Sequence, residues 1–157
     1  SKGKLNVAHY IFAQNLYFDF ATRYASLHPT IASPKDFKLS EDDFNNFVDY
    51  LHEKNFTYSY QTNKYFQQLY QVAKIEGLDS IAQSEFEALK TKLTPNVDAD
   101  IRENKDEIEA LLSLEIIKRY YYQKGQIEFS LRTDDDLKEA IQILKSEETY
   151  RKILSAI

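Results

Sequence analysis

Residues 98–131, DADIRENKDEIEALLSLEIIKRYYYQKGQIEFSL, form the longest helical pattern in the chain. Apolar side chains recur along this stretch every three or four residues, which is the spacing of one face of an α-helix. Those on the first side are Ile101, Ile108, Leu112, Ile116, Tyr120, Ile127 and Leu131. The pattern predicts one long helix near 98–131. Asn104 with Lys105, or else Gly125, is expected to kink it.

The same stretch carries apolar side chains on its second side as well, and a helix that is apolar on both sides is usually buried on both sides. Two hypotheses follow. Either this is the central helix of a bundle, or its second side docks against another part of a larger protein or another subunit. The docking hypothesis expects Tyr121 or Tyr122 to be exposed in the isolated chain, because tyrosine suits interfaces. The candidate docking surface comprises Tyr121, Tyr122, Leu114 and Phe129.

Helical spacing also predicts helices before this stretch. One helix is expected over residues 5–27, ending at the segment His28–Pro34, because a residue before proline is pushed out of the α conformation. Ser40 is expected to cap a helix that ends near residue 54, since the three residues after it are acidic and complement the helix dipole. Residues 56–60 alternate aromatic and polar side chains and predict a short extended crossing.

Three further helices are predicted around these. Helical spacing resumes over residues 62–76, with Tyr65, Phe66, Leu69, Val72 and Ala73 as its apolar positions, and Gly77 is expected to end this helix. The next helix is expected to be capped by Asp79 or Ser80, with Ile81, Phe86, Leu89 and Leu93 facing inward. After residue 131, helical spacing returns over 137–144 and again from Ser146 onward. The fold class is therefore all-α, an irregular multi-helix bundle with little or no sheet.

The composition agrees with a helical domain cut from a larger protein. The chain has 157 residues with only three glycines and three prolines, where average usage gives about eleven and eight. It contains no methionine, so we expect a fragment. Residues 1–157 are predicted to form one helical domain. A split into 1–78 and 79–157 is the alternative, because the net charge is 0 in the first part and −5 in the second.

The overall charge and apolar content exclude several function classes. The net charge is −5, which disfavours nucleic acid as a partner, because binding phosphates requires a basic patch. No apolar run approaches the ~20 residues of a membrane span. The absence of cysteine excludes disulfides, thiol catalysis and thiolate metal ligands.

No pattern in the sequence points to chemistry. The glycines are isolated, so neither a phosphate loop nor a glycine-rich oxyanion turn is present. Ser113 and Lys118 are five residues apart on the predicted helix and do not share a face. His52 follows Asp49 by three residues, but a ferritin-like metal centre needs that spacing twice with further carboxylates. The sequence therefore predicts no catalytic, cofactor-binding or metal-ligating residue in this chain.

Two segments carry a family resemblance. LYFDFATRY at residues 16–24, followed by Pro29, Thr30 and Ile31, resembles the segment after the catalytic core in carboxyl-terminal processing (tail-specific) serine peptidases of the Bacteroides group. EIIKRYYYQKGQIE at residues 115–128 is similar to a motif near the C-terminus of the same proteins. The order of the segments matches as well, so that the resemblance covers nearly the whole chain.

The resemblance implies a parent protein that is a serine endopeptidase of the periplasm or cell envelope, with a PDZ module and a Ser–Lys dyad. Neither the PDZ module nor the dyad has a counterpart in this chain. The implied function is a non-catalytic C-terminal helical accessory domain. Its implied partners are the rest of the parent chain, another subunit and the parent's protein substrates. The alternative is a stand-alone helical protein–protein interaction module, which the gene context upstream of Ser1 would distinguish.

Overall fold

The computed structural model describes residues 5–130 together with residues 142 and 151. These residues contain seven helices and no strand, which confirms the all-α class. The helices predicted after residue 131 lie outside the described residues. The seven helices are α1 (Val7–Ala13), α2 (Leu16–Leu27), α3 (Glu41–Glu53), α4 (Gln61–Glu76), α5 (Gln83–Leu93), α6 (Val97–Glu103) and α7 (Lys105–Ser130).

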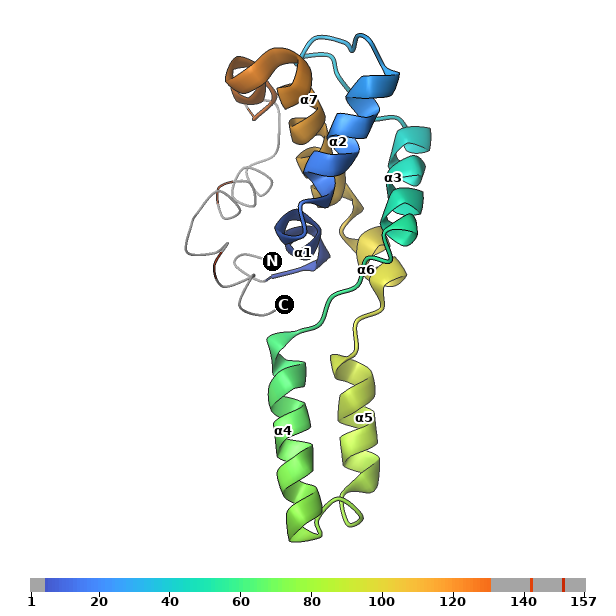
Figure 1. Ribbon diagram of the computed structural model, residues 1–157, viewed down its shortest axis with the longest axis vertical. Coiled ribbons are helices and arrows are strands. Elements are labelled where there is room, and N and C mark those ends of the chain that lie inside the picture. Colours follow the sequence, from blue (N-terminus) through green and yellow to red (C-terminus); the bar gives the residue numbers. More distant parts are fainter. Residues whose placement is uncertain (1–4, 131–141, 143–150, 152–157) are drawn as a thin grey trace.

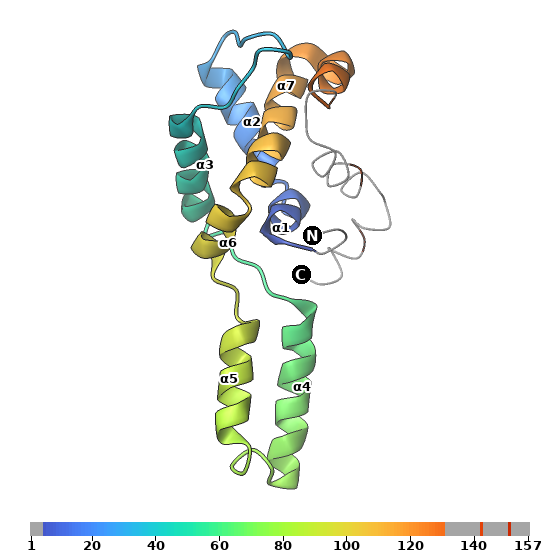
Figure 2. The ribbon, with the colours of Figure 1, turned by 180° about the vertical axis from the view of Figure 1, so that it is seen from behind.

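The helices form a body and a projecting arm. Helices α1, α2, α3, α6 and α7 make up the body, and α4 and α5 form an antiparallel hairpin that extends away from it (Figures 1 and 2). Residues 54–60 lead out to the arm, and residues 94–96 lead back. The alternative split into residues 1–78 and 79–157, which was based on net charge, would fall in the loop that joins α4 to α5.

The first predicted helix is wrong as a single element. Residues 5–27 form α1 and α2, because Asn15 adopts the left-handed conformation with φ 63° and breaks the chain direction. Asparagine is one of the few residues besides glycine that tolerates this region. The Asn6 side chain caps α1 by accepting a hydrogen bond from the Ala8 backbone N–H at 2.9 Å. The break lets both short helices place aromatic side chains in the core.

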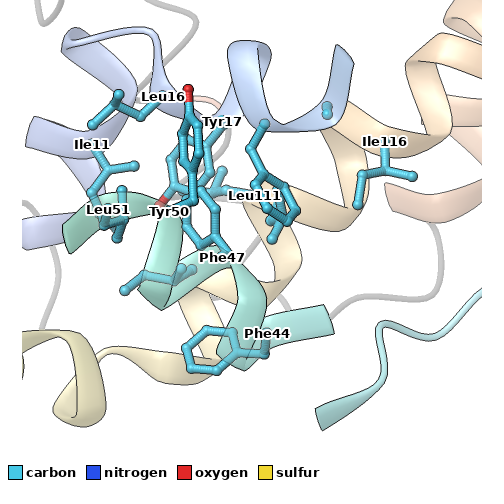
Figure 3. Packing of buried hydrophobic residues seen from close by; sticks show 14 of the residues in the cluster. Ile11, Leu16, Tyr17, Phe44, Phe47, Tyr50, Leu51, Leu111 and Ile116 are labelled. Atoms are coloured by element: carbon cyan, nitrogen blue, oxygen red, sulfur yellow. The ribbon is translucent and has the colours of Figure 1, made fainter. Parts of the chain in front are cut away.

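Helix α3 follows its sequence signals closely. The Ser40 hydroxyl oxygen accepts a hydrogen bond from the Asp43 backbone N–H at 3.0 Å, which confirms the predicted N-cap. Phe44, Phe47 and Leu51 are buried on the inner face. In Figure 3, Phe47 and Leu51 lie among the side chains of the other body helices.

The predicted 98–131 helix is divided at Asn104, which is one of the two alternative kink positions given by the sequence. Asn104 lies between α6 and α7, and its side-chain amide donates to the Asp100 carbonyl oxygen at 2.8 Å. The second departure from helical geometry is at Tyr122, with φ 53° and ψ −152°. It therefore lies three residues before Gly125, the alternative kink position. Glycine was the obvious residue for such a conformation, and here a tyrosine adopts it.

Helix α7 is the centre of the body. Eight consecutive residues, 110–117, are all buried, which means that two full turns are covered on every side. Helix α2 lies along α7 in both views, and α1 and α6 also contact it (Figures 1 and 2). The hypothesis of a central helix is thus met for this part of α7.

Stacked aromatic rings join α2 to α3 beside α7. The Tyr17 ring stacks on Phe47 with centroids 5.5 Å apart, and Phe20 meets Phe47 edge-on at 5.0 Å. Figure 3 shows Tyr17, Phe47 and Leu111 gathered in this part of the core. Burial raises the pKa of the Tyr17 hydroxyl well above its ordinary value.

Tyr58, in the segment that leads out to the arm, joins that segment to the body by a hydrogen bond and a stacking contact. The Tyr58 hydroxyl donates to an Asp100 carboxylate oxygen, which ties the outgoing segment to α6. The Tyr58 ring stacks on Tyr10 of α1 with centroids 4.6 Å apart. Burial and this hydrogen bond raise the pKa of Tyr58. The 56–60 segment is a crossing without strand pairing, as predicted.

His9 is a buried, titratable group at the start of α1. It is 4% exposed, and its Nδ1 accepts a hydrogen bond from the Asn6 backbone N–H at 3.3 Å. Burial lowers the pKa of His9 below the ordinary 6.5, and the nearby Glu107 carboxylate opposes this effect only in part. The folded protein therefore favours neutral His9.

We expect the free energy of unfolding to fall as the pH drops below about 6.5, because the unfolded chain then binds a proton that the folded chain resists. Glutamine at this N3 position keeps the hydrogen bond to the cap and does not titrate. Denaturant unfolding of the wild type and His9→Gln from pH 7.5 to pH 5 should show the two stability curves diverging, with the wild type losing more. Parallel curves would contradict this role of His9.

Candidate interaction surfaces

The four predicted docking residues lie in different environments. Tyr121 and Tyr122 are 37% and 78% exposed, whereas Leu114 is 4% exposed and belongs to the core. The side chain of Phe129 lies outside the described part of the chain. The candidate surface on α7 therefore begins only after the two buried turns, and Leu114 is not available on it.

Two of the three consecutive tyrosines hold the loop that follows α2. The Tyr120 hydroxyl donates to the His28 carbonyl oxygen at 2.5 Å, and the Tyr121 hydroxyl donates to the Ile31 carbonyl oxygen at 3.3 Å. The His28 ring stacks on Tyr24 of α2 with centroids 3.9 Å apart. Burial raises the pKa of Tyr120, so its hydroxyl stays a donor. The two segments that carry the family resemblance therefore contact each other here.

Tyr122 has no such role among the described contacts. It stands at the non-helical position of α7 and is the most exposed of the three tyrosines. A positive φ at a bulky residue costs on the order of 1–3 kcal/mol, and such strain is often found at functional positions. An exposed aromatic ring on a strained backbone makes this end of α7 a candidate contact for another protein.

A second contact between α2 and α7 lies next to the tyrosines. The Arg119 guanidinium lies over the Phe18 ring, 4.0 Å from its centroid, and also donates to the Phe18 carbonyl oxygen at 3.2 Å. Glu115, which is 8% exposed, accepts a hydrogen bond from Lys118 at 2.5 Å and pairs with Arg119 at 3.8 Å. Phe18 itself is 48% exposed. The half-exposed Phe18 ring is thus held in position by Arg119.

The arm carries a second exposed apolar surface. On α4, Tyr65, Leu69 and Val72 are 59%, 55% and 50% exposed, and Leu89 on α5 is 42% exposed. We call these four residues the arm flank. At 100° per residue the three α4 positions lie within about 60° of one another. Phe66 and Ala73 are the buried residues of α4, and the Phe66 ring contacts Phe86 of α5. Toward the tip, Ile75, Leu78 and Ile81 are also exposed.

The opposite side of the hairpin is different in shape and chemistry. Phe86 of α5 packs edge-on against Tyr70 at 5.3 Å and Phe66 at 6.0 Å. A groove passes over these rings, with polar side chains that include Gln83, Glu87 and Lys90 along its wall. None of the arm-flank residues lines this groove.

The sequence misplaced these residues of the arm. Tyr65, Leu69 and Val72 are apolar positions of the predicted helix, as expected, but they are exposed. Ile81 and Leu89 were expected to face inward, but both are exposed and no residue of α5 is buried. The predicted caps are also wrong, because α5 begins after Ala82 without a side-chain cap. Gly77 does end α4 in the left-handed conformation, as predicted. The number of apolar positions could have indicated this, because two short helices that pack only on each other cannot bury so many apolar side chains.

Residues 7–144 match the family model described as probable PDZ-protease, C-terminal helical domain. The chain belongs to this family. No curated protein and no solved structure matches it. The match supports the part of the resemblance that concerns a C-terminal helical domain of PDZ-proteases.

The described part of the PDZ-protease helical domain shows where the few polar candidates lie. Ser113 is 5% exposed, and the Lys118 ammonium is engaged by Glu115. The His52 ring pairs with Asp98 at 2.7 Å rather than with Asp49. Within residues 5–130, 142 and 151, no three histidine or acidic side chains are grouped to hold a metal ion. In the same residues no helix has the length and apolar character needed to cross a membrane.

We expect Tyr120→Phe to lower the free energy of unfolding by about 1 kcal/mol, because the His28 carbonyl oxygen loses its donor. Tyr122→Phe removes a hydroxyl from an exposed ring, so its effect should stay within about 0.5 kcal/mol. Chemical denaturation of the two variants beside the wild type measures both. Equal effects of the two substitutions would show that the Tyr120 contact does not hold the loop.

Proposed function

We propose that this chain is the non-catalytic accessory domain of a periplasmic, PDZ-containing serine endopeptidase that trims or degrades the C-terminal tails of proteins. The observation that carries the proposal is the family match over residues 7–144. The resemblance of residues 16–24 and 115–128 to tail-specific peptidases adds the substrate class and the location in the cell envelope.

The geometry supports an accessory role. Peptide hydrolysis by a serine enzyme needs a nucleophile beside a base and donors for the oxyanion. Here Ser113 is enclosed in the core and Lys118 is bound to Glu115. The features that reach the surface are aromatic side chains on rigid helices, which are suited to protein contacts.

The contact with the remainder of the parent protein is proposed at Tyr122 of α7. Tyr122 projects there at 78% exposure, close in sequence to the tyrosines that fix the 28–31 loop. Rigid aromatic side chains lose little conformational entropy on binding, so they give affinity efficiently. The stand-alone interaction module remains the second candidate, because the arm flank is also open to a partner.

The purified chain should hydrolyse no unstructured protein, whereas the parent protein should. Hydrolysis by the pure chain that a serine-directed inhibitor abolishes would overturn the non-catalytic assignment. To test the contact, the remaining part of the parent is produced separately and titrated with this chain. Tyr122→Asp should weaken binding by about tenfold or more, and Tyr122→Phe should leave it unchanged. Absence of binding to the wild-type chain would favour the stand-alone module.

A further inference from the structure

We propose that two copies of this chain associate through their arms, with the arm flank of one copy packed antiparallel on the arm flank of the other. This inference rests on the exposed residues of α4 and α5 and does not depend on the proposed link to a protease. The occupant of the flank is a second copy of the chain, and the pairing is symmetric.

The first argument is the apolar surface itself. Tyr65, Leu69 and Val72 lie along one side of α4, and each keeps half or more of its area exposed. Leu89 on α5 is exposed as well, and like the three α4 residues it does not line the groove. Large exposed apolar residues gathered on two neighbouring helices are typical of a protein interface rather than of free surface. α4 and α5 pack chiefly on each other, and Figures 1 and 2 show the described body helices lying beyond the base of the arm.

The second argument is the distribution of charge around the flank. Outside the groove, the exposed charges at the base of the arm are Lys64 on α4 and Lys92 on α5. Toward the tip they are Glu76 on α4 and Glu85 on α5. The four charges therefore form two basic positions at one end and two acidic positions at the other.

The remaining charges of the arm belong to its other side. Lys74 lies over the Tyr70 ring at 4.9 Å, on the groove side. Asp79, Glu87 and Lys90 line the groove directly. The polarity of the flank, basic at the base and acidic at the tip, is thus not cancelled by neighbours on the same side.

Only one mutual orientation satisfies this polarity. In a parallel pair the lysines of both copies would meet at one end and the glutamates at the other, and like charges directly opposite disfavour association. In an antiparallel pair each basic end meets an acidic end. A two-fold axis passing near Leu69 produces this arrangement and uses the same surface of both copies, as a closed symmetric dimer requires.

The dimensions are compatible with such a contact. Helix α4 has 16 residues, which corresponds to a length of about 24 Å. Lys64 and Glu76 are twelve positions apart, or about 18 Å along the axis. Two antiparallel α4 helices centred near Leu69 bring each lysine next to the other copy's glutamate while the apolar residues meet between them. The resulting contact is a four-helix arrangement of two hairpins.

Sedimentation velocity over a wide range of protein concentration tests the apolar part of the proposal. The wild-type chain should form a dimer, and Leu69→Asp should raise its dissociation constant by about thirtyfold or more. Leu27→Asp is the matched control, because Leu27 is 68% exposed on α2 of the body, and it should dimerise like the wild type. Circular dichroism checks that each variant keeps its helix content.

Charge reversal tests the orientation. The base-reversed chain carries Lys64→Glu and Lys92→Glu, and the tip-reversed chain carries Glu76→Lys and Glu85→Lys. Each alone should dimerise at least about tenfold more weakly than the wild type, because like charges then face each other. An equimolar mixture should form a heterodimer in which every facing pair is complementary. Higher salt should reduce these differences.

Three results would overturn the proposal. A wild-type chain that stays monomeric at all concentrations leaves the flank to a different partner. A dimer that survives Leu69→Asp uses another surface. Reversed chains that dimerise as well separately as when mixed would exclude the antiparallel orientation.

Discussion

The fold depends on the complete burial of two turns of α7. Most surface helices of globular proteins bury one stripe, whereas residues 110–117 of α7 are covered all round. This requires neighbours on every side, and the chain supplies them from α1 and α2, which are distant in sequence, and from α6, which directly precedes α7. The aromatic residues of α2 and α3 then pack on one another beside this axis.

The same constraint explains how the body and the arm differ. The body is built around a helix that cannot be exposed, so its elements depend on one another. The arm has only two helices, in which Phe66 and Ala73 are the buried residues of α4 and no residue of α5 is buried. Its connection to the body runs through Tyr58, which links α1 and α6 by ring stacking and a hydrogen bond. The arm therefore has little core of its own, and apolar side chains remain exposed on it.

The sequence predicted the helix ends that depend on a single residue and its immediate neighbours. Ser40 with its acidic turn, Gly77 after α4 and Asn104 before α7 all act where the sequence placed them. Asn15 was missed because asparagine permits the left-handed conformation without requiring it, and nothing in the neighbouring residues demanded a break. Tyr122 was missed for the opposite reason, since a tyrosine rarely adopts such a backbone.

The surfaces were harder to predict than the helices. Periodicity shows which side of a helix is apolar, but not whether another element covers that side. Leu114 and Leu69 illustrate this, because both lie on apolar sides of amphipathic patterns, yet the first is 4% exposed and the second is 55% exposed. The difference comes from the number of helices that reach each place. The sequence thus predicted the two exposed tyrosines of the candidate site on α7, but it wrongly included the buried Leu114.

Native-state hydrogen exchange in dilute protein tests this account most directly. The backbone amides of residues 108–117 should exchange only through global unfolding, whereas those of α4 and α5 should exchange through local opening at a lower free energy. Arm amides that are as protected as those of α7 in the monomer would contradict the account, as would α7 amides that exchange before the rest of the body.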